Sequence, residues 1–358
     1  MRGHGTDIGS TVLSGRAVQF TALDALRGVA ALGVALFHFF PGWAGYLAVD
    51  FFFVLSGFIL SHGYLYGPRQ LSLSEFLVHR LARLYPLHVY ALGVFVVVAY
   101  WLHGRWPSYP DGTVFTLVQH LLLLNNVGLN SAGLTYNEPS WSISVEFVVN
   151  LLFFWFVSAR TLSLLLAAVA LVGFALMGAL TGHLDVHYQN YFGYLNAGLV
   201  RCVSSFSLGI LTYRVYRWWQ SETRAFGAAS WVEWALVAMV VGVLFARPHK
   251  TSVLDFVAPF LFIAVVFVFA LEQGWLSSHV RRLAHLGKIS YSIYLNQFVV
   301  LMVFRNFWPD GGGRVMLLCF LGVLLVYSYA TFYWLEQPAR LYLRRKFERN
   351  RSGAWNNT

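Results

Sequence analysis

The 358-residue sequence predicts an all-α fold, a polytopic transmembrane bundle of about ten spanning helices with both termini in the cytoplasm. Hydrophobic residues make up 58% of the chain and charged residues only 11%, against roughly 45–50% and about 25% in soluble domains. The apolar runs are about 17–22 residues long, which suits spanning helices and not the short alternating strands of a barrel. Aromatic residues reach 18%, as in bundles with interfacial belts.

Ten apolar runs, taken in chain order, are the predicted spans. They cover residues 22–40, 47–66, 86–102, 141–158, 162–180, 194–217, 230–246, 252–272, 289–307 and 314–335. A further apolar stretch, residues 113–128, is short for a span and contains Gln119, His120, Asn125 and Asn126. We expect a re-entrant or interfacial helix there, and a full crossing is the alternative.

The positions of the basic residues predict the orientation. Eighteen of the 25 Lys and Arg residues fall in or beside segments that ten crossings place on one side. Cytoplasmic segments of membrane proteins carry such an excess, so this side is predicted to be the cytoplasm. The segments are the N-terminal tail, 67–85, 159–161, 218–229, 273–288 and 336–358. The net charge of +10 is therefore explained by topology, and no nucleic-acid partner is implied.

The chain reads as a single domain over residues 1–358. Residues 1–21 lack the apolar core and small-residue cleavage site of a signal peptide, so we expect a cytoplasmic tail. The bundle occupies 22–335, and a basic cytoplasmic tail covers 336–358. Cys202 and Cys319 lie in apolar runs without the spacing of a metal or redox site, so no metal is expected. With no soluble catalytic module predicted, any chemistry must take place in the bundle or at its two mouths.

The first span carries Asp24, Arg27 and His38 in LDALRGVAALGVALFH, where ionisable groups are costly and usually functional. Eleven residues separate Arg27 from His38, which on a helix places them on one stripe about 16 Å apart. Arg27 could anchor a phosphate or carboxylate at the cytoplasmic rim, and His38 could act as a general base deeper in the membrane. In the alternative, Arg27 pairs with Asp24 and His38 only bonds a neighbouring helix.

Two further stretches carry candidates near the ends of spans. Asp50 opens VDFFFVLSGFIL and could orient an imidazole, whereas Ser56 lies beside Gly57 in a pattern typical of close helix packing. Arg80 and Arg83 share one face of SLSEFLVHRLARLYPLH. They predict either a lipid-headgroup surface or a phosphate site for a cytoplasmic cofactor.

A third group lies in later spans. Trp141 and Glu146 open the fourth span in SWSISVEF, and a buried glutamate requires a partner. Arg201, inside the sixth span, is the counter-ion we expect, either in a structural clasp or beside a functional carboxylate. Tyr291, in LGKISYSIYL, is a candidate hydrogen-bonding residue between helices.

These motifs together resemble the integral-membrane acyltransferase 3 family of bacterial O-acyltransferases, which act on surface glycans and secreted small molecules. The matching stretches occur in the family's order over residues 23–340 and include LDALRGVAALGVALFH, VDFFFVLSGF, RLARLYPL, SWSISVEF, LGKISYSIYL and EQPAR. One departure is visible: Asn296 and Gln297 stand where the family often has a late histidine.

The resemblance implies an acyl-CoA donor, acetyl-CoA first, which is used from the cytoplasm, and a hydroxyl of a carbohydrate or glycan-like acceptor. It implies that Arg27 and His38 are essential and that Arg80 and Arg83 lie near the donor. We expect His38 to be the general base, with Asp50 or Glu146 orienting it, in a multi-pass protein of the bacterial inner membrane that contacts lipid. The alternative function is a transporter or flippase that uses the same intramembrane charges for a polar solute.

Overall fold

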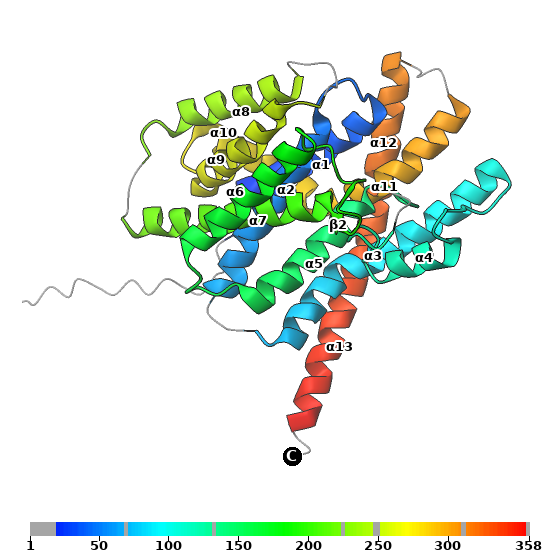
Figure 1. The fold of residues 1–358 in the computed structure, drawn as a ribbon, viewed down its shortest axis with the longest axis horizontal. Helices are drawn as coiled ribbons and strands as arrows, with labels where there is room; N and C mark the ends of the chain where they lie inside the picture. Colours follow the sequence, from blue (N-terminus) through cyan, green and yellow to red (C-terminus); the bar gives the residue numbers. More distant parts are fainter. Residues whose placement is uncertain are drawn as a thin grey trace, which may run out of the picture.

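The computed structural model describes residues 19–67, 71–130, 134–222, 226–245, 251–308 and 313–355. The expected N-terminal tail lies mostly outside these ranges. The described chain is almost entirely helical (Figure 1). Its elements are α1 (Thr21–Phe39), α2 (Ala48–Leu60), α3 (Leu73–His103), α4 (Thr113–Leu121), α5 (Ser140–Phe156), α6 (Ser163–Leu180), β1 (Asn190–Tyr191), β2 (Leu195–Asn196), α7 (Ala197–Ser221), α8 (Ala229–Phe245), α9 (Val257–Leu271), α10 (Trp275–Val280), α11 (Ala284–Phe307), α12 (Gly313–Thr331) and α13 (Gln337–Trp355).

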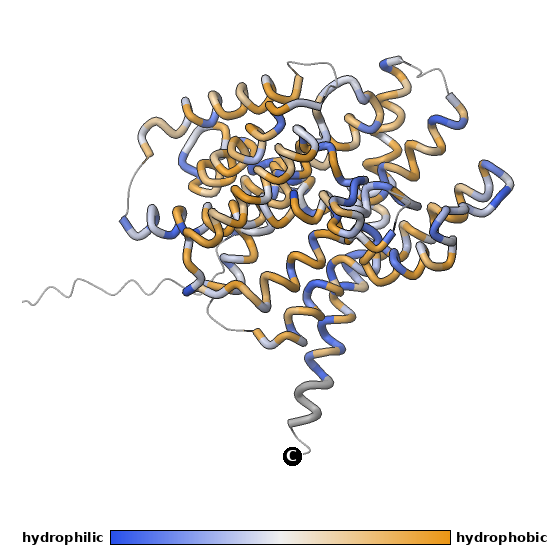
Figure 2. The backbone as a smooth tube through the Cα atoms, viewed as in Figure 1, coloured by the Kyte–Doolittle hydropathy of each residue, from blue (hydrophilic) through white to orange (hydrophobic). Residues whose placement is uncertain are grey.

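Seven helical segments in the described residues are long and apolar enough to cross a membrane, which confirms a multi-pass helical protein. Two further apolar helices, α5 and α8, have 17 residues each. Helix α7 has 25 residues and a buried face, but a more mixed composition. Apolar residues cover most of the bundle, while hydrophilic residues gather along α13 (Figure 2). The count of ten spans and the cytoplasmic position of both termini stay predictions.

The predicted start of the third span, at residue 86, is wrong, because α3 begins earlier. The amphipathic stretch 72–88 and the span 86–102 form one helix of 31 residues that continues through Pro86. It begins at Ser72, whose side chain accepts from the Glu75 backbone in a capping box, and ends at Gly104 with φ of 67°. At about 1.5 Å per residue the helix is longer than the roughly 30 Å hydrocarbon core, so part of it extends beyond that core.

Two other segments differ in length from the predicted spans. Helix α4, expected within 113–128, has nine residues and is too short to span, as the interfacial interpretation requires. The predicted tail 336–358 is largely helix α13, which continues α12 through a π turn at Phe332–Glu336. It packs against α3 and projects from the bundle (Figure 1).

Glycines bring the central helices into close contact. A Cβ atom at Gly57 of α2 would overlap the carbonyl oxygen of Phe206, and one at Gly209 of α7 would overlap that of Val54. Glycine pairs of this kind let helix backbones approach closely in membranes. Helices α1 and α11 meet in the same way, because a Cβ at Gly28 would lie 2.5 Å from the Cβ of Leu286. These contacts fix α1, α2, α7 and α11 around the candidate site.

Candidate active site

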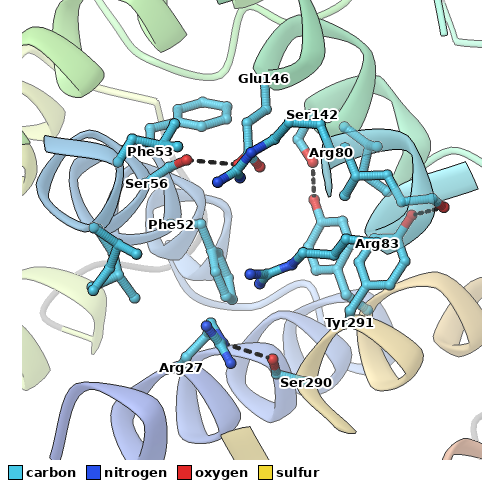
Figure 3. Close-up of a pocket in the computed structure, with 16 residues that line it drawn as sticks. Arg27, Phe52, Phe53, Ser56, Arg80, Arg83, Ser142, Glu146, Ser290 and Tyr291 are labelled. Atoms are coloured by element: carbon cyan, nitrogen blue, oxygen red, sulfur yellow. Dashed lines mark hydrogen bonds between the residues drawn. The ribbon is translucent and has the colours of Figure 1, made fainter. Parts of the chain in front are cut away.

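Three arginines from two helices line one pocket, which we call the arginine pocket. Arg27 comes from α1, and Arg80 and Arg83 come from successive turns of α3. Their guanidinium groups reach into the same space from different sides (Figure 3). The sequence predicted Arg80 and Arg83 on one face, and the structure brings Arg27 to that face. The other lining residues are Phe52, Phe53, Leu55, Ser56, Ile59, Leu60, Leu84, Ser142, Ile143, Glu146, Ser290, Tyr291 and Tyr294.

The three arginines differ in how they are held. Arg27 donates to the Ser290 hydroxyl at 3.0 Å and to the Gly287 carbonyl at 2.8 Å, and it pairs with Asp24 at 3.2 Å. Arg80 lies over the rings of Tyr64 and Phe76, at 5.4 and 5.7 Å from their centroids. No described residue forms a hydrogen bond or ion pair with Arg83, so its charge is available to a ligand. Arg27 therefore pairs with Asp24 and also lines the arginine pocket.

Glu146, expected near the start of the fourth span, lies among these arginines. Its carboxylate accepts a hydrogen bond from Ser56 at 2.7 Å (Figure 3). Ser56 is thus directed into the pocket, and the adjacent Gly57 makes the backbone contact with α7. Three arginines against one glutamate leave the pocket positively charged, which suits an anionic ligand.

A second cavity of about 300 Å³ adjoins the arginine pocket and shares Arg27 and Arg83 with it. Lys288 and Arg340 line this cavity, together with Glu336. We call this part of the bundle the basic end, defined by Arg27, Arg80, Arg83, Lys288 and Arg340. The sequence stretch EQPAR supplies three of the lining residues, Glu336, Gln337 and Arg340.

His38 lies on a different cavity, of about 200 Å³, which we call the histidine cavity. It is lined by Glu138, Asp185, His187 and Trp141. The Trp141 ring stacks on His187 with centroids 4.6 Å apart, and His187 Nδ1 lies 3.4 Å from Asp185. The Nδ1 atom of His38 is buried and has no hydrogen-bond partner among the described residues. The His38 ring also interacts with the Gln297 side chain of α11.

The acidic residues of the histidine cavity come from loops, and sequence reasoning missed them. Glu138 precedes α5, and Asp185 lies between α6 and β1. Burial raises the pKa of Glu138, although the neighbouring His187 acts in the opposite direction. The available signal was the polar loop 181–193, which carries Asp185 and His187 two residues apart. No group of three or more His, Cys, Asp or Glu in the described ranges is arranged to hold a metal ion.

Asp50 and Arg201 form a buried clasp between α2 and α7, which corrects the expected pairing of Arg201 with Glu146. The guanidinium donates to the Asp50 carboxylate at 2.6 Å and to the carbonyl of Leu184 at 2.8 Å. Ser205 donates to the same carboxylate at 2.8 Å. Asp50 is therefore fully engaged, and neither Asp50 nor Glu146 lines the cavity of His38. The prediction that one of them orients His38 finds no support in this geometry.

The remaining candidates join helices. The Tyr291 hydroxyl donates to the Leu84 carbonyl at 2.7 Å and lines the arginine pocket. Asn296, which stands near the family's late histidine, bonds Thr331 of α12 at 2.8 Å. Gln297 donates to the Tyr294 carbonyl at 3.0 Å. Both side chains are buried, and the Asn296 bond joins α11 to α12.

Comparisons with known proteins identify a family and several relatives. A family described as an acyltransferase domain, acyltransferase 3, matches residues 20–335. Protein 2 in the picA locus of Rhizobium radiobacter is 40% identical over 154 residues, which are 37% of this chain and 79% of that protein. Acyltransferase MdmB of Streptomyces mycarofaciens is 34% identical over 156 residues, 38% of this chain and 39% of that protein.

A shorter match involves a larger protein. O-acetyltransferase OatA of Staphylococcus aureus is 35% identical over 77 residues, 20% of this chain and 13% of that protein. The aligned regions therefore span well under half of MdmB and of OatA. No solved structure matches the chain.

Proposed function

We propose that this chain, which belongs to the acyltransferase 3 family, is a membrane O-acyltransferase that uses acyl-CoA and acylates a hydroxyl of a carbohydrate or glycan-like acceptor. One observation carries the proposal. Helix α1 lines a positively charged pocket with Arg27 and, eleven residues later, a separate cavity with His38. Donor and acceptor would thus meet along one helix from opposite ends of the bundle.

The basic end suits the donor. Coenzyme A carries several phosphate charges, and arginine is the side chain that pairs best with phosphate. Lys288 and Arg340 stand in the outer of the two adjoining cavities, and Arg27 and Arg83 line both. The nucleotide would bind at the outer cavity, and the pantetheine arm would carry the thioester into the arginine pocket. We propose a short acyl group such as acetyl, in line with the relative named as an O-acetyltransferase.

The histidine cavity suits a polyhydroxylated acceptor. Glu138 and Asp185 offer hydrogen-bonding oxygens, and Trp141 offers an aromatic face. His38 would take the proton of the acceptor hydroxyl while the oxygen adds to the thioester carbonyl carbon. Collapse of the tetrahedral intermediate breaks the carbon–sulfur bond, and the CoA thiolate leaves and receives the proton from His38. An ester and free CoA are the products.

The proposed location is the inner membrane of a bacterium, with the basic end in the cytoplasm where acyl-CoA is made. The named relatives are bacterial proteins, and the excess of basic residues at one end supports this orientation. The acceptor would then approach from the periplasmic side.

The test is an assay of purified protein in lipid nanodiscs with acetyl-CoA and a panel of soluble glycans. We expect CoA release that depends on the glycan, and a glycan mass increased by one acetyl group. Solute uptake into proteoliposomes, with no CoA release from any acyl-CoA, would instead support the transporter alternative. Mass spectrometry of surface glycans from cells with and without the gene identifies the natural acceptor.

A further inference from the structure

One residue of the described chain lines both the arginine pocket and the histidine cavity. It is Tyr294, in the middle of α11, and its side chain is 7% exposed. Arg27 and His38, the two ends of the proposed reaction path, line one cavity each. The path from thioester to acceptor therefore runs past the Tyr294 ring.

The position of Tyr294 is fixed from three sides. Its hydroxyl shares a 2.8 Å hydrogen bond with Ser142 of α5, as the dashed line from Ser142 marks in Figure 3. Its ring meets Phe52 of α2 edge-on, with centroids 5.7 Å apart. Gln297 holds the backbone carbonyl of Tyr294 from the next turn of α11. The ring is thus held across the boundary between the two cavities.

The chemistry requires such a boundary. A thioester beside an aqueous cavity is exposed to hydrolysis, and an enzyme prevents this loss by excluding water. The same boundary limits how far an acyl chain extends beyond the thioester, because additional methylenes need space that the ring occupies. The hydrogen bond with Ser142 holds the hydroxyl end of the ring, so loss of this bond would weaken the boundary.

We propose that Tyr294, held by Ser142, is the partition between donor and acceptor cavities, and that it sets acyl-chain length and shields the thioester from water. This inference rests on the proposed function. Tyr294 is a specificity-determining residue in this scheme, and no covalent step on its hydroxyl is involved.

The experiment compares Tyr294→Phe, Tyr294→Leu and Ser142→Ala with the unchanged protein in nanodiscs. CoA release is measured from acetyl-, butyryl- and hexanoyl-CoA, with and without acceptor. Tyr294→Leu should raise glycan-independent release relative to transfer by about tenfold, and it should raise the butyryl-to-acetyl ratio by a similar factor, the scale expected for pocket discrimination of methylenes. Tyr294→Phe and Ser142→Ala both remove the hydrogen bond between these residues, so both should raise hydrolysis. Both variants keep the ring, so they should retain the preference for acetyl.

The matched control is Tyr216, a buried tyrosine of α7 that lines neither cavity and bonds Gln220. Its Phe and Leu variants should keep both ratios. If Tyr294→Leu has the hydrolysis ratio and chain-length profile of the unchanged protein, Tyr294 is not the partition. If Tyr294→Leu does not insert, an unchanged hydrolysis ratio in both Tyr294→Phe and Ser142→Ala overturns the proposal. An unchanged protein that releases no CoA from any donor would overturn the proposed function itself.

Discussion

At the scale of single residues, some polar groups of the site already have hydrogen-bond or ion-pair partners within the protein, and others have none among the described residues. Arg27 makes three polar contacts within the protein, whereas Arg83 makes no hydrogen bond or ion pair with any described residue. Likewise the Nδ1 atom of His38 lacks a partner in the described structure. Buried polar groups are normally hydrogen-bonded, so the Nδ1 atom of His38 is an exception that a ligand or water would explain, whereas Arg83 is only partly buried. Arg83 and His38 are therefore the sharpest probes of donor and acceptor.

Replacement of His38 by alanine should lower acyl transfer by about 10²–10⁴-fold, the usual effect of losing a general base. CoA affinity should be unchanged, because His38 lies outside the basic end. The measurement is glycan-dependent CoA release beside a CoA titration, with His279→Ala as the control because His279 lines neither the arginine pocket nor the histidine cavity. Full turnover by correctly inserted His38→Ala would remove His38 from the mechanism.

Replacement of Arg83 by glutamine should weaken CoA binding by about 10–100-fold, since hydrogen bonds to charged groups contribute about 1.5–3 kcal/mol. Stability in detergent should change little, because Arg83 has no internal partner to lose. Calorimetric titration with CoA measures the affinity, and the exposed Arg160→Gln is the control. Equal affinities in the two variants would support a lipid-headgroup role for this face of α3.

At the scale of elements, ion pairs and glycines hold the helices that shape the two cavities. The Asp50–Arg201 clasp and the Gly57 and Gly209 contacts join α2 to α7. Gly28 and Gly287 join α1 to α11 and place Arg27 against Ser290. The clasp lies beside the histidine cavity, since Arg201 also lines it. Because the clasp joins two central helices, the main expected effect of removing it is a loss of stability.

Asp50→Ala and Arg201→Ala should each destabilise the protein by about 3–5 kcal/mol, because each leaves a buried charge without its partner. A double change, Asp50→Leu with Arg201→Met, should recover part of that loss. Thermal unfolding in detergent measures all three variants. Glu146→Gln is the matched control, and it should not share the stability loss because Glu146 does not contact Arg201. A melting temperature close to that of the unchanged protein in both alanine variants would contradict the clasp.

At the scale of the whole molecule, the bundle has two different cavities, a basic one and one that contains His38. Helix α13 is largely hydrophilic and projects from the bundle (Figures 1 and 2), and the basic end lines two adjoining cavities. The histidine cavity is built by loops that precede α5 and follow α6. A transferase that joins a cytoplasmic donor to an acceptor across the membrane requires two such different ends.

The predicted orientation can be tested with single cysteines in a background where Cys202 and Cys319 are replaced by serine. An impermeant maleimide added to spheroplasts should label Ser108→Cys, in the loop after α3. Arg160→Cys, in the loop after α5, should be labelled only after lysis. Both positions are exposed, so access depends on the membrane and not on burial. The opposite labelling pattern would reverse the assignment of donor and acceptor sides.

Much of the architecture follows from local properties of the sequence. Long apolar runs identify helices in a membrane because the backbone must satisfy its own hydrogen bonds there. The stripe that carries Arg27 and His38 follows from helical periodicity alone. The short apolar stretch that became α4 was recognisable by its length and polar residues. Boundaries were less certain, because the sequence does not show that α3 continues through Pro86 or that α13 packs on α3.

Pairings between distant residues were decided only by the tertiary structure. Glu146 and Arg201 each required a partner, and the sequence offered these charges on the fourth and sixth spans. Because α2 packs against α7, Arg201 pairs with Asp50. Glu146 instead lies in the arginine pocket and accepts a hydrogen bond from Ser56. Glu138 and Asp185 lie on loops and line the same cavity as His38. Loops have no sequence periodicity from which this placement could be predicted. A sequence therefore reports which groups are costly to bury, whereas the rotation and approach of the helices determine which partner satisfies each one.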